Sequence, residues 1–156
     1  SPDCAACPLG DRCRARAESR VGQLPVKAVK TAVTSRWFNY LCIRCNGELL
    51  LSKRTGNDIW MNLYEFPLIE TDSEMDFSVL SHTAAFRELL GDTAFTLMKA
   101  TKMSKHQLSH RTIHSTFYEL EVSAFPSHAE KFLRVDEGAL GDYAVSRLTD
   151  LYLERR

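Results

Sequence analysis

TAVTSRWFNYLCIRCNGELLLSKR, residues 31–54, is the stretch that decides the fold class of this chain. Its first part, through Arg44, is rich in β-branched and aromatic residues, which favour a strand. Asn46-Gly47 is the strongest short signal for a two-residue hairpin turn, and ELLLSKR supplies the returning strand. The stretch therefore predicts two antiparallel strands at the start of a folded domain.

Further strands and two helices are expected beyond this hairpin. LYEFPLI (63–69) predicts a third strand, and FTLMKATKM (95–103) and TIHSTFYELEV (112–122) predict two more, with SKHQLSH as the loop between them. Residues 77–90 carry apolar side chains at roughly helical intervals, and Gly91 follows as a helix-ending residue. Residues 144–156 predict a closing helix with Val145, Leu148, Leu151 and Tyr152 on one side. The pattern indicates an α+β domain, a mixed sheet flanked by helices.

Length and composition narrow the class of protein. A chain of 156 residues suits one ordinary domain, and 44% hydrophobic with 26% charged residues is typical of a globular fold. No run of eighteen apolar residues and no signal peptide is visible. Five unevenly spaced cysteines favour reduced thiols in a cytoplasm over a secreted disulfide framework. Net charge is zero, yet residues 12–36 and 93–118 are both basic, which indicates a side that faces a polyanion.

Three cysteines open the chain with metal-ligand spacing. Cys4, Cys7 and Cys13 stand as C-x2-C-x5-C around the turn-forming PLGD. Thiolates in such loops hold iron–sulfur clusters or zinc. A cluster or a tetrahedral ion needs four ligands, so one ligand is missing from this set.

The motifs resemble the C-terminal part of the adenine DNA glycosylases, the MutY family. The cysteine spacing is similar to the tail of that family's [4Fe–4S] loop, C-x6-C-x2-C-x5-C, which places the fourth cysteine before residue 1. LPVKAVKTAV resembles the family's connector, and WMNLYEFP resembles its W..L.EFP motif. KHQLSHRTIH resembles the lesion-recognition loop, with Leu108 in place of the common aromatic residue. ALGDYAVSRLTDLYL resembles the closing helix without the proline often found at its start.

The resemblance implies three parts of the chain. Residues 1–13 would be the end of the [4Fe–4S] cluster loop, with Cys4, Cys7 and Cys13 as ligands, and residues 14–30 an interdomain connector. Residues 31–156 would be a Nudix-like lesion-recognition domain. The cluster belongs to the full-length protein and is expected to be absent from this fragment.

The resemblance also implies a function in base-excision repair. The whole enzyme removes adenine mispaired with 8-oxoguanine, and it flips the adenine because the bond is inaccessible in the stacked duplex. The catalytic carboxylates lie in an N-terminal helical domain, so this segment carries none and is expected to be inactive alone. Its expected partners are double-stranded DNA with 8-oxoguanine:adenine mispairs and that catalytic domain, in the cytoplasm at the nucleoid. The DNA- and lesion-binding residues would be Leu108, Ser109, His110, Lys102, Lys105 and Arg111.

An active Nudix pyrophosphohydrolase is the first alternative, because its fold is similar. The Nudix box, G-x5-E-x7-R-E-U-x-E-E-x-G-U, supplies helix carboxylates for a divalent metal. Arg87, Glu88 and Leu89 match its R-E-U portion. Four other box positions fall on Ser73, Val79, Gly91 and Asp92. Without most of its carboxylates the box predicts no magnesium site.

A zinc ribbon is the second alternative, with Cys42 and Cys45 paired to Cys4 and Cys7. A strand would place Cys42 and Cys45 on opposite faces, which favours buried thiols instead. His106, His110 and His114 share a spacing of four, but the β-prone sequence around them favours DNA contact or plain surface over a metal site. Trp37, Trp60, Phe66 and Phe86 are expected in the core, with one of them free to border a DNA surface.

Overall fold

The computed structural model describes residues 2–26 and 32–156, which divide into two compact units, Ser1–Ala32 and Val33–Arg156. Among its described residues, the first unit has three short helical turns: η1 (Gly10–Arg12), α1 (Arg14–Ala17) and η2 (Val21–Gln23). Lys27 and Lys30 of the expected connector, and Thr31 at the expected strand start, lie outside the described residues. The assignment of roles to residues 1–13, 14–30 and 31–156 stays a prediction.

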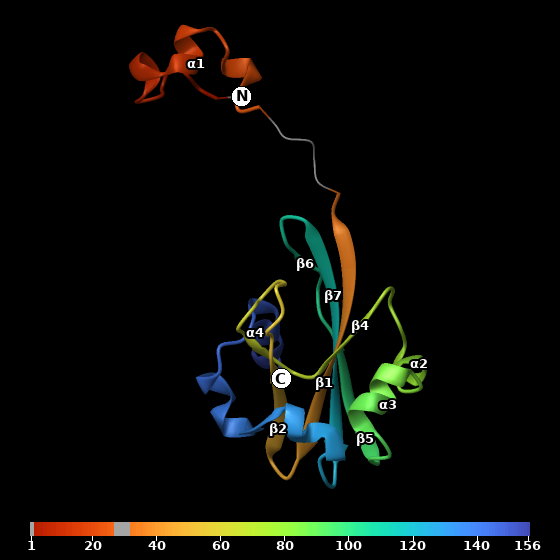
Figure 1. The fold of residues 1–156 in the computed structure, drawn as a ribbon. Coiled ribbons are helices and arrows are strands. Elements are labelled where there is room, and N and C mark those ends of the chain that lie inside the picture. The colour runs from red at the N-terminus through yellow and green to blue at the C-terminus, as the bar shows by residue number, and fades with distance from the viewer. Residues whose placement is uncertain (1, 27–31) are drawn as a thin grey trace. The chain divides into compact units, whose positions relative to one another are not determined.

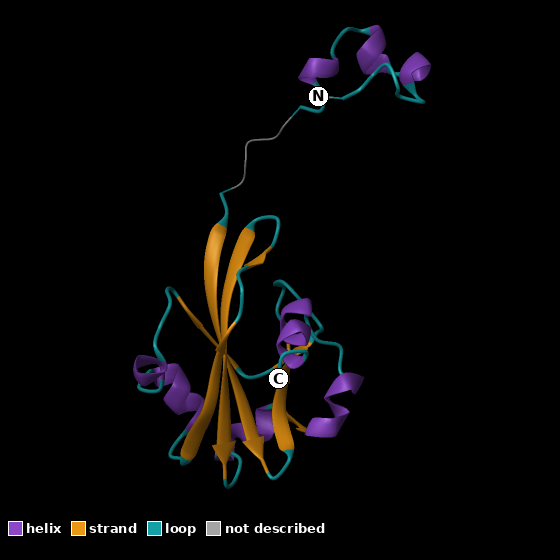
Figure 2. Cartoon of the chain, turned by 180° about the vertical axis from the view of Figure 1, so that it is seen from behind, coloured by secondary structure: helices purple, strands orange, loops and turns teal. Residues whose placement is uncertain are grey.

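The second unit is built on one mixed sheet (Figure 1). Its central strands are β1 (Thr34–Cys45) and β7 (Arg111–Val122), which pair in parallel from Thr34 opposite Arg111 to Arg44 opposite Glu121. They run side by side through the domain (Figure 2). The remaining strands pair antiparallel. In the part of the chain that is described, these are β2 (Glu48–Lys53), β3 (Tyr64–Glu65), β4 (Leu68–Thr71), β5 (Phe95–Lys102), β6 (His106–Gln107) and β8 (Leu133–Asp136).

Helices cover both faces of the sheet, so the core has two layers (Figure 1). On β1, Phe38, Tyr40 and Cys42 enter one cluster with Leu148 and Tyr152 of α4 (Arg147–Leu153). Successive strand residues point to opposite faces. The alternate β1 residues therefore enter a second cluster, under α2 (Phe77–Leu80), α3 (Ala84–Leu90) and η3 (Ser127–Lys131). A further turn, η4 (Glu137–Asp142), follows β8.

The structure confirms the deciding hairpin. Cys45 pairs with Glu48, and Asn46 and Gly47 between them both have positive φ, 51° and 83°. Positive φ at both central residues is the mark of a type I′ turn, whose backbone twist matches the right-handed twist of the two strands. The expected α+β class, a mixed sheet flanked by helices, is also confirmed.

Several expected elements are wrong in extent. The single helix over 77–90 is two helices, because Thr83 caps a new one: its hydroxyl accepts from the Phe86 N–H at 3.2 Å. The single strand over 63–69 is split into β3 and β4 around Pro67, which has no N–H for a sheet. The closing helix starts later than expected, at Arg147 after the Ser146 cap, so Val145 is not helical.

The aromatic core expectation holds for Phe66 and Phe86, at 0% and 2% exposure. Trp37 and Trp60 are only partly buried, so they border the surface instead. No helix within residues 2–26 and 32–156 has the length and apolar character that a bilayer crossing requires.

Candidate functional site

The stretch that resembles a recognition loop forms a tight turn between β6 and β7. The Leu108 N–H donates to the Arg111 carbonyl at 2.8 Å, which leaves Ser109 and His110 at the exposed tip. The Thr34 N–H at the start of β1 donates to the His110 carbonyl at 3.1 Å. The turn is therefore fixed through its backbone while both tip side chains face solvent.

Asp58, in the loop after β2, ties this turn to the sheet. One carboxylate oxygen accepts from Arg111, and the other accepts from Arg36 at 2.7 Å and Arg54 at 3.1 Å. Arg36 also makes a two-pronged pair with Glu70, at 2.5 and 2.7 Å. Three guanidinium groups from three segments of the chain thus converge on a single carboxylate.

This arrangement fixes the charge of Asp58. Partial burial alone would raise its pKa, but hydrogen bonds from Arg36, the Ile59 backbone and Arg111 outweigh burial and hold the pKa well below its usual range. The hydrogen bond to Glu70 is the main cause that raises the pKa of Arg36. The carboxylate of Asp58 is thus held in its charged form beside the charged Arg36 guanidinium.

Loop and turn together enclose a hollow of about 450 Å³. We call it the Asp58 hollow; it is lined by Asn57, Asp58, Ile59, Leu108, Ser109, His110 and Arg111. Four of the six residues predicted to bind DNA therefore meet at one place. Leu108 is half-buried and packs against the core beneath the hollow, so it anchors the turn.

The sequence did not single out the loop that supplies Asp58. Its shape depends on backbone conformations that the sequence does not announce: Trp60 and Asn62 have positive φ, 60° and 69°. A bulky residue in that region is uncommon, and such strain gathers at functional sites. Trp60 packs edge-on against Phe38, with ring centroids 6.1 Å apart, which holds the loop against the core.

Lys102 and Lys105, the other predicted DNA contacts, lie on the opposite face of β1 and β7. Arg36 reaches Asp58, whereas its neighbour Trp37 lines a different hollow with both lysines. Adjacent residues of a strand point to opposite faces. The six predicted residues therefore do not form a single patch.

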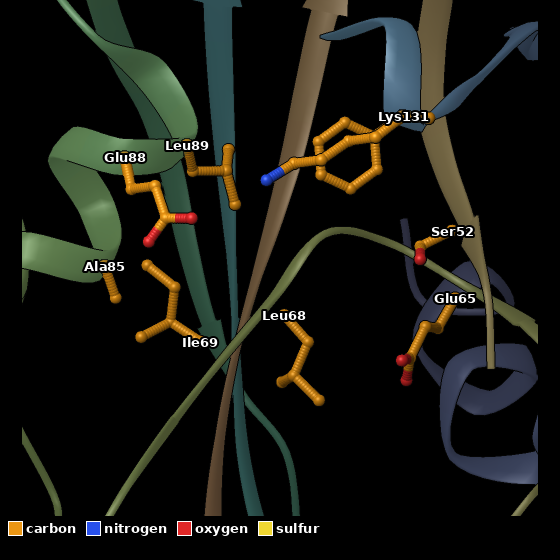
Figure 3. Close-up of a pocket in the computed structure, with 9 residues that line it drawn as sticks. Ser52, Glu65, Leu68, Ile69, Ala85, Glu88, Leu89 and Lys131 are labelled. Atoms are coloured by element: carbon orange, nitrogen blue, oxygen red, sulfur yellow. The ribbon is translucent and has the colours of Figure 1, made fainter. Parts of the chain in front are cut away.

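A third hollow, of about 380 Å³, lies beside α3 where a Nudix box would place its carboxylates (Figure 3). We call it the Glu88 hollow; its lining includes Glu88 of α3, Glu65 of β3 and Lys131 of η3. Figure 3 shows Glu88 and Glu65 on opposite sides of Leu68 and Ile69, with the Lys131 ammonium pointing inward. The helix ends at Gly91, whose φ is 56°, so the box positions at residues 91 and 92 are off the helix.

A chain of hydrogen bonds connects the Asp58 hollow to the Glu88 hollow. Arg54 donates to both oxygens of Glu65, each at 2.8 Å, and to Asp58. The Tyr40 hydroxyl donates to Glu65 at 3.2 Å. Burial raises the pKa of Glu65 despite Arg54, and burial likewise raises the pKa of Tyr40. Arg54 is thus the shared partner of the partly buried Asp58 in one hollow and the buried Glu65 in the other.

The cysteines do not form a metal site in this structure. Within the described residues, no three His, Cys, Asp or Glu side chains are grouped closely enough to hold an ion, Cys4, Cys7 and Cys13 included. Cys42 and Cys45 are buried on opposite faces of the sheet, as the strand reading predicts. Burial raises the pKa of the Cys42 thiol, which disfavours the thiolate that zinc requires.

A mixed sheet between helices, with the R-E-U portion of the box on α3, is the arrangement of the Nudix class of fold. The chain belongs to the NUDIX domain family, whose model matches residues 39–155. Among solved structures, a MutT protein from Methanosarcina mazei Go1 is 16% identical, with a TM-score of 0.57 over 82% of this chain and 95% of that one. The C-terminal domain of mouse MUTYH, solved in complex with human PCNA, is 14% identical, with a TM-score of 0.54 over 78% and 89%. These likenesses show the fold.

Sequence relatives are more specific. An adenine DNA glycosylase of Buchnera aphidicola subsp. Acyrthosiphon pisum is 29% identical over 73 residues, 47% of this chain and 21% of the relative. The same enzyme from Buchnera aphidicola subsp. Schizaphis graminum is 30% identical over 71 residues, 46% and 20%. The matched part is about a fifth of the length of these relatives. The sequence-based recognition is confirmed at this level: a Nudix-like domain distantly similar to adenine DNA glycosylases.

Proposed function

We propose that this chain is the C-terminal, lesion-reading part of an adenine DNA glycosylase that removes adenine mispaired with 8-oxoguanine. The observation that carries the proposal is the turn at residues 108–111, which resembles the family's recognition loop. It presents Ser109 and His110 to solvent on a fixed backbone beside the Asp58 hollow. A reader needs such a placement, because its contacting groups must be exposed while their positions are set in advance.

The chemistry of the lesion suits a short polar residue. 8-Oxoguanine carries a carbonyl at C8 and a hydrogen on N7, so an acceptor of guanine becomes a donor. The Ser109 hydroxyl can both donate and accept. His110 would reach a phosphate or brace the turn. A reader is required because adenine itself is a normal base, and excision without a check of its partner would damage ordinary A·T pairs.

Within this proposal the segment performs no catalysis. The residues that cleave the glycosidic bond would lie in an N-terminal helical domain of the whole protein. Arg111 holds the turn in place rather than contacting DNA, because its guanidinium is paired with Asp58. Ser109 and His110 are then the residues that contact the lesion strand.

The test measures duplex affinity in the full-length protein that carries this chain. Ser109→Ala with His110→Ala is expected to reduce the preference for 8-oxoguanine over guanine by about 1–3 kcal/mol, the worth of one or two hydrogen bonds. Affinity for undamaged duplex should change much less, because phosphate contacts supply most of it. Fluorescence anisotropy with matched 8-oxoguanine:A and G:A duplexes gives both numbers.

Ser123→Ala with His128→Ala is the matched control, since both side chains are exposed and lie outside the turn. It should keep the full preference. If the double variant of the turn also keeps it, residues 108–110 do not read the lesion.

The cysteine loop carries a separate proposal. Cys4, Cys7 and Cys13 would supply three thiolates to a [4Fe–4S] cluster whose fourth ligand precedes residue 1. This chain, purified alone, is therefore expected to hold no stable cluster, because one ligand is missing. Iron and zinc analysis with visible absorption spectra checks this. Stoichiometric zinc would favour the zinc-ribbon alternative, and a stable iron–sulfur chromophore would contradict the four-ligand argument.

A further inference from the structure

The face of β1 and β7 opposite the Asp58 hollow carries a hollow of its own. It measures about 280 Å³, and we call it the Trp37 hollow. Its lining residues are Trp37, Glu74, Lys102, Met103, Lys105, His114, Ser115 and Thr116. It shares no lining residue with the Asp58 hollow.

Two aromatic side chains are among the residues that line it. Trp37 and His114 are direct partners in the parallel pairing of β1 and β7, and their rings stack with centroids 4.9 Å apart and planes 9° apart. Both side chains are only partly buried. One face of each ring is covered by the other ring, so the pair is a platform that accepts a further ring on an outer face, and aromatic platforms stack on the bases of nucleic acids in this way.

Charges at the rim favour an anion. Lys102 pairs with Glu74 across the hollow, so those two charges compensate each other. The hydrogen bond from Lys102, with a smaller contribution from His114, lowers the pKa of Glu74 and keeps it charged. Lys105 is exposed and makes no ion pair with any residue in the described part of the chain, so its positive charge is left uncompensated at the hollow.

We propose that the Trp37 hollow binds one nucleotide, with its base against the Trp37–His114 platform and its phosphate at Lys105. The volume is near the low end of ligand sites, which suits one base with its phosphate. The nucleotide has two sources with the same chemistry: a free nucleoside monophosphate, or one residue of a DNA single strand. Neither source involves the residues of the Asp58 hollow.

The experiment titrates this chain with four probes while the ring signals of Trp37 and His114 are followed by NMR. The probes are deoxyadenosine 5′-monophosphate, deoxyadenosine, inorganic phosphate and a short oligodeoxyadenylate. The monophosphate should shift both rings and saturate at about 1 mM, the range of a small ligand with few contacts. Deoxyadenosine and phosphate should each bind more weakly, because each lacks one half of the recognition.

Two lysine variants make the test specific. Lys105→Ala should weaken monophosphate binding about tenfold, the loss of one charge-assisted contact. Lys99→Ala on β5 should leave it unchanged, because Lys99 is exposed and outside the hollow. The amide spectrum of each variant shows whether the fold is retained.

The outcomes separate the sources and the alternatives. Ring shifts with the monophosphate assign the site to a free nucleotide, and shifts with the oligonucleotide alone assign it to a strand. If inorganic phosphate binds as tightly as the monophosphate, the base does not stack on the Trp37–His114 platform. If no probe shifts either ring, the hollow is not a nucleotide site. Because lesion preference is measured with Ser109 and His110, failure here leaves the proposed function standing, and the reverse also holds.

Discussion

The Asp58 hollow and the Glu88 hollow both contain carboxylates, but their charges are balanced in different ways. Asp58 accepts from three arginines, whereas Glu88 is exposed and pairs with none of the described residues. The first hollow is thereby a braced polar surface with its negative charge neutralised. The second keeps a single helix carboxylate where a hydrolase would cluster several. The paired polar network of this Nudix-type fold therefore centres on Arg54 and Asp58 beside the turn, and Glu88, the carboxylate on α3, stands outside it.

Removal of Arg54 should produce the largest effect, because Arg54 serves both hollows. Arg54→Ala leaves Glu65 buried and without its cation, and breaking a buried pair costs about 3–5 kcal/mol of unfolding free energy. Urea denaturation at neutral pH measures the loss. Arg147→Ala removes two exposed ion pairs, with Asp150 and Glu154, and should cost far less.

The Arg54 effect should depend on pH in a defined direction. Burial raises the folded-state pKa of Glu65 above its unfolded value, so its ionisation opposes folding as pH rises through that window. Loss of Arg54 raises this pKa further. The penalty of Arg54→Ala should therefore be smallest at acidic pH, where Glu65 is protonated in both states, and should grow toward neutral pH. A penalty independent of pH would show that Glu65 is not its cause.

Asp58→Asn should have an intermediate effect confined to the Asp58 hollow. The variant leaves three converging guanidinium groups without their shared anion, at a cost of about 1–3 kcal/mol. The folded-state pKa of Asp58 is lowered, so its contribution is present above its unfolded pKa and is lost as pH falls through the folded one. The stability difference between Asp58→Asn and the unaltered chain should thus shrink in acid.

Lesion preference should fall with Asp58→Asn as well, because Arg111 and the turn lose their brace. Asp72→Asn is the matched control, since Asp72 is exposed and outside both hollows. If Asp58→Asn keeps the lesion preference, the ion pairs of Asp58 stabilise the fold but play no part in lesion recognition by the turn.

Glu88→Gln should have the smallest effect of the three. Glu88 is an exposed helix residue, so the substitution should change stability by about 0.5 kcal/mol or less. We also expect no magnesium-dependent hydrolysis of nucleoside diphosphate derivatives by this chain, because Val79, Gly91 and Asp92 replace glutamates of the box. Robust turnover that Glu88→Gln abolishes would assign a working pyrophosphohydrolase to the Glu88 hollow and reverse the comparison.

Local chemistry explains which predictions succeeded. The hairpin at Asn46-Gly47 and the strands over 95–102 and 111–122 depend on neighbouring residues, so their sequence patterns predict them. The prediction of one helix over 77–90 was wrong because Thr83 caps a new helix, although the helical spacing of apolar residues continues across it. Residues 108–111 were identified through a resemblance, since four residues of a tight turn carry little pattern of their own.

The sequence by itself determined the fold class, the distant kinship with adenine DNA glycosylases and the loss of most of the Nudix box, because each depends on which residues occur and in what order. Only the tertiary structure brought Asp58 to Arg36 and Arg111, and it divided the predicted DNA contacts between two faces. The physical reason is that β1 and β7 pair in parallel across a long separation in sequence, and alternate residues of each strand face opposite sides. Charge partners chosen by such pairing leave no local signal along the chain.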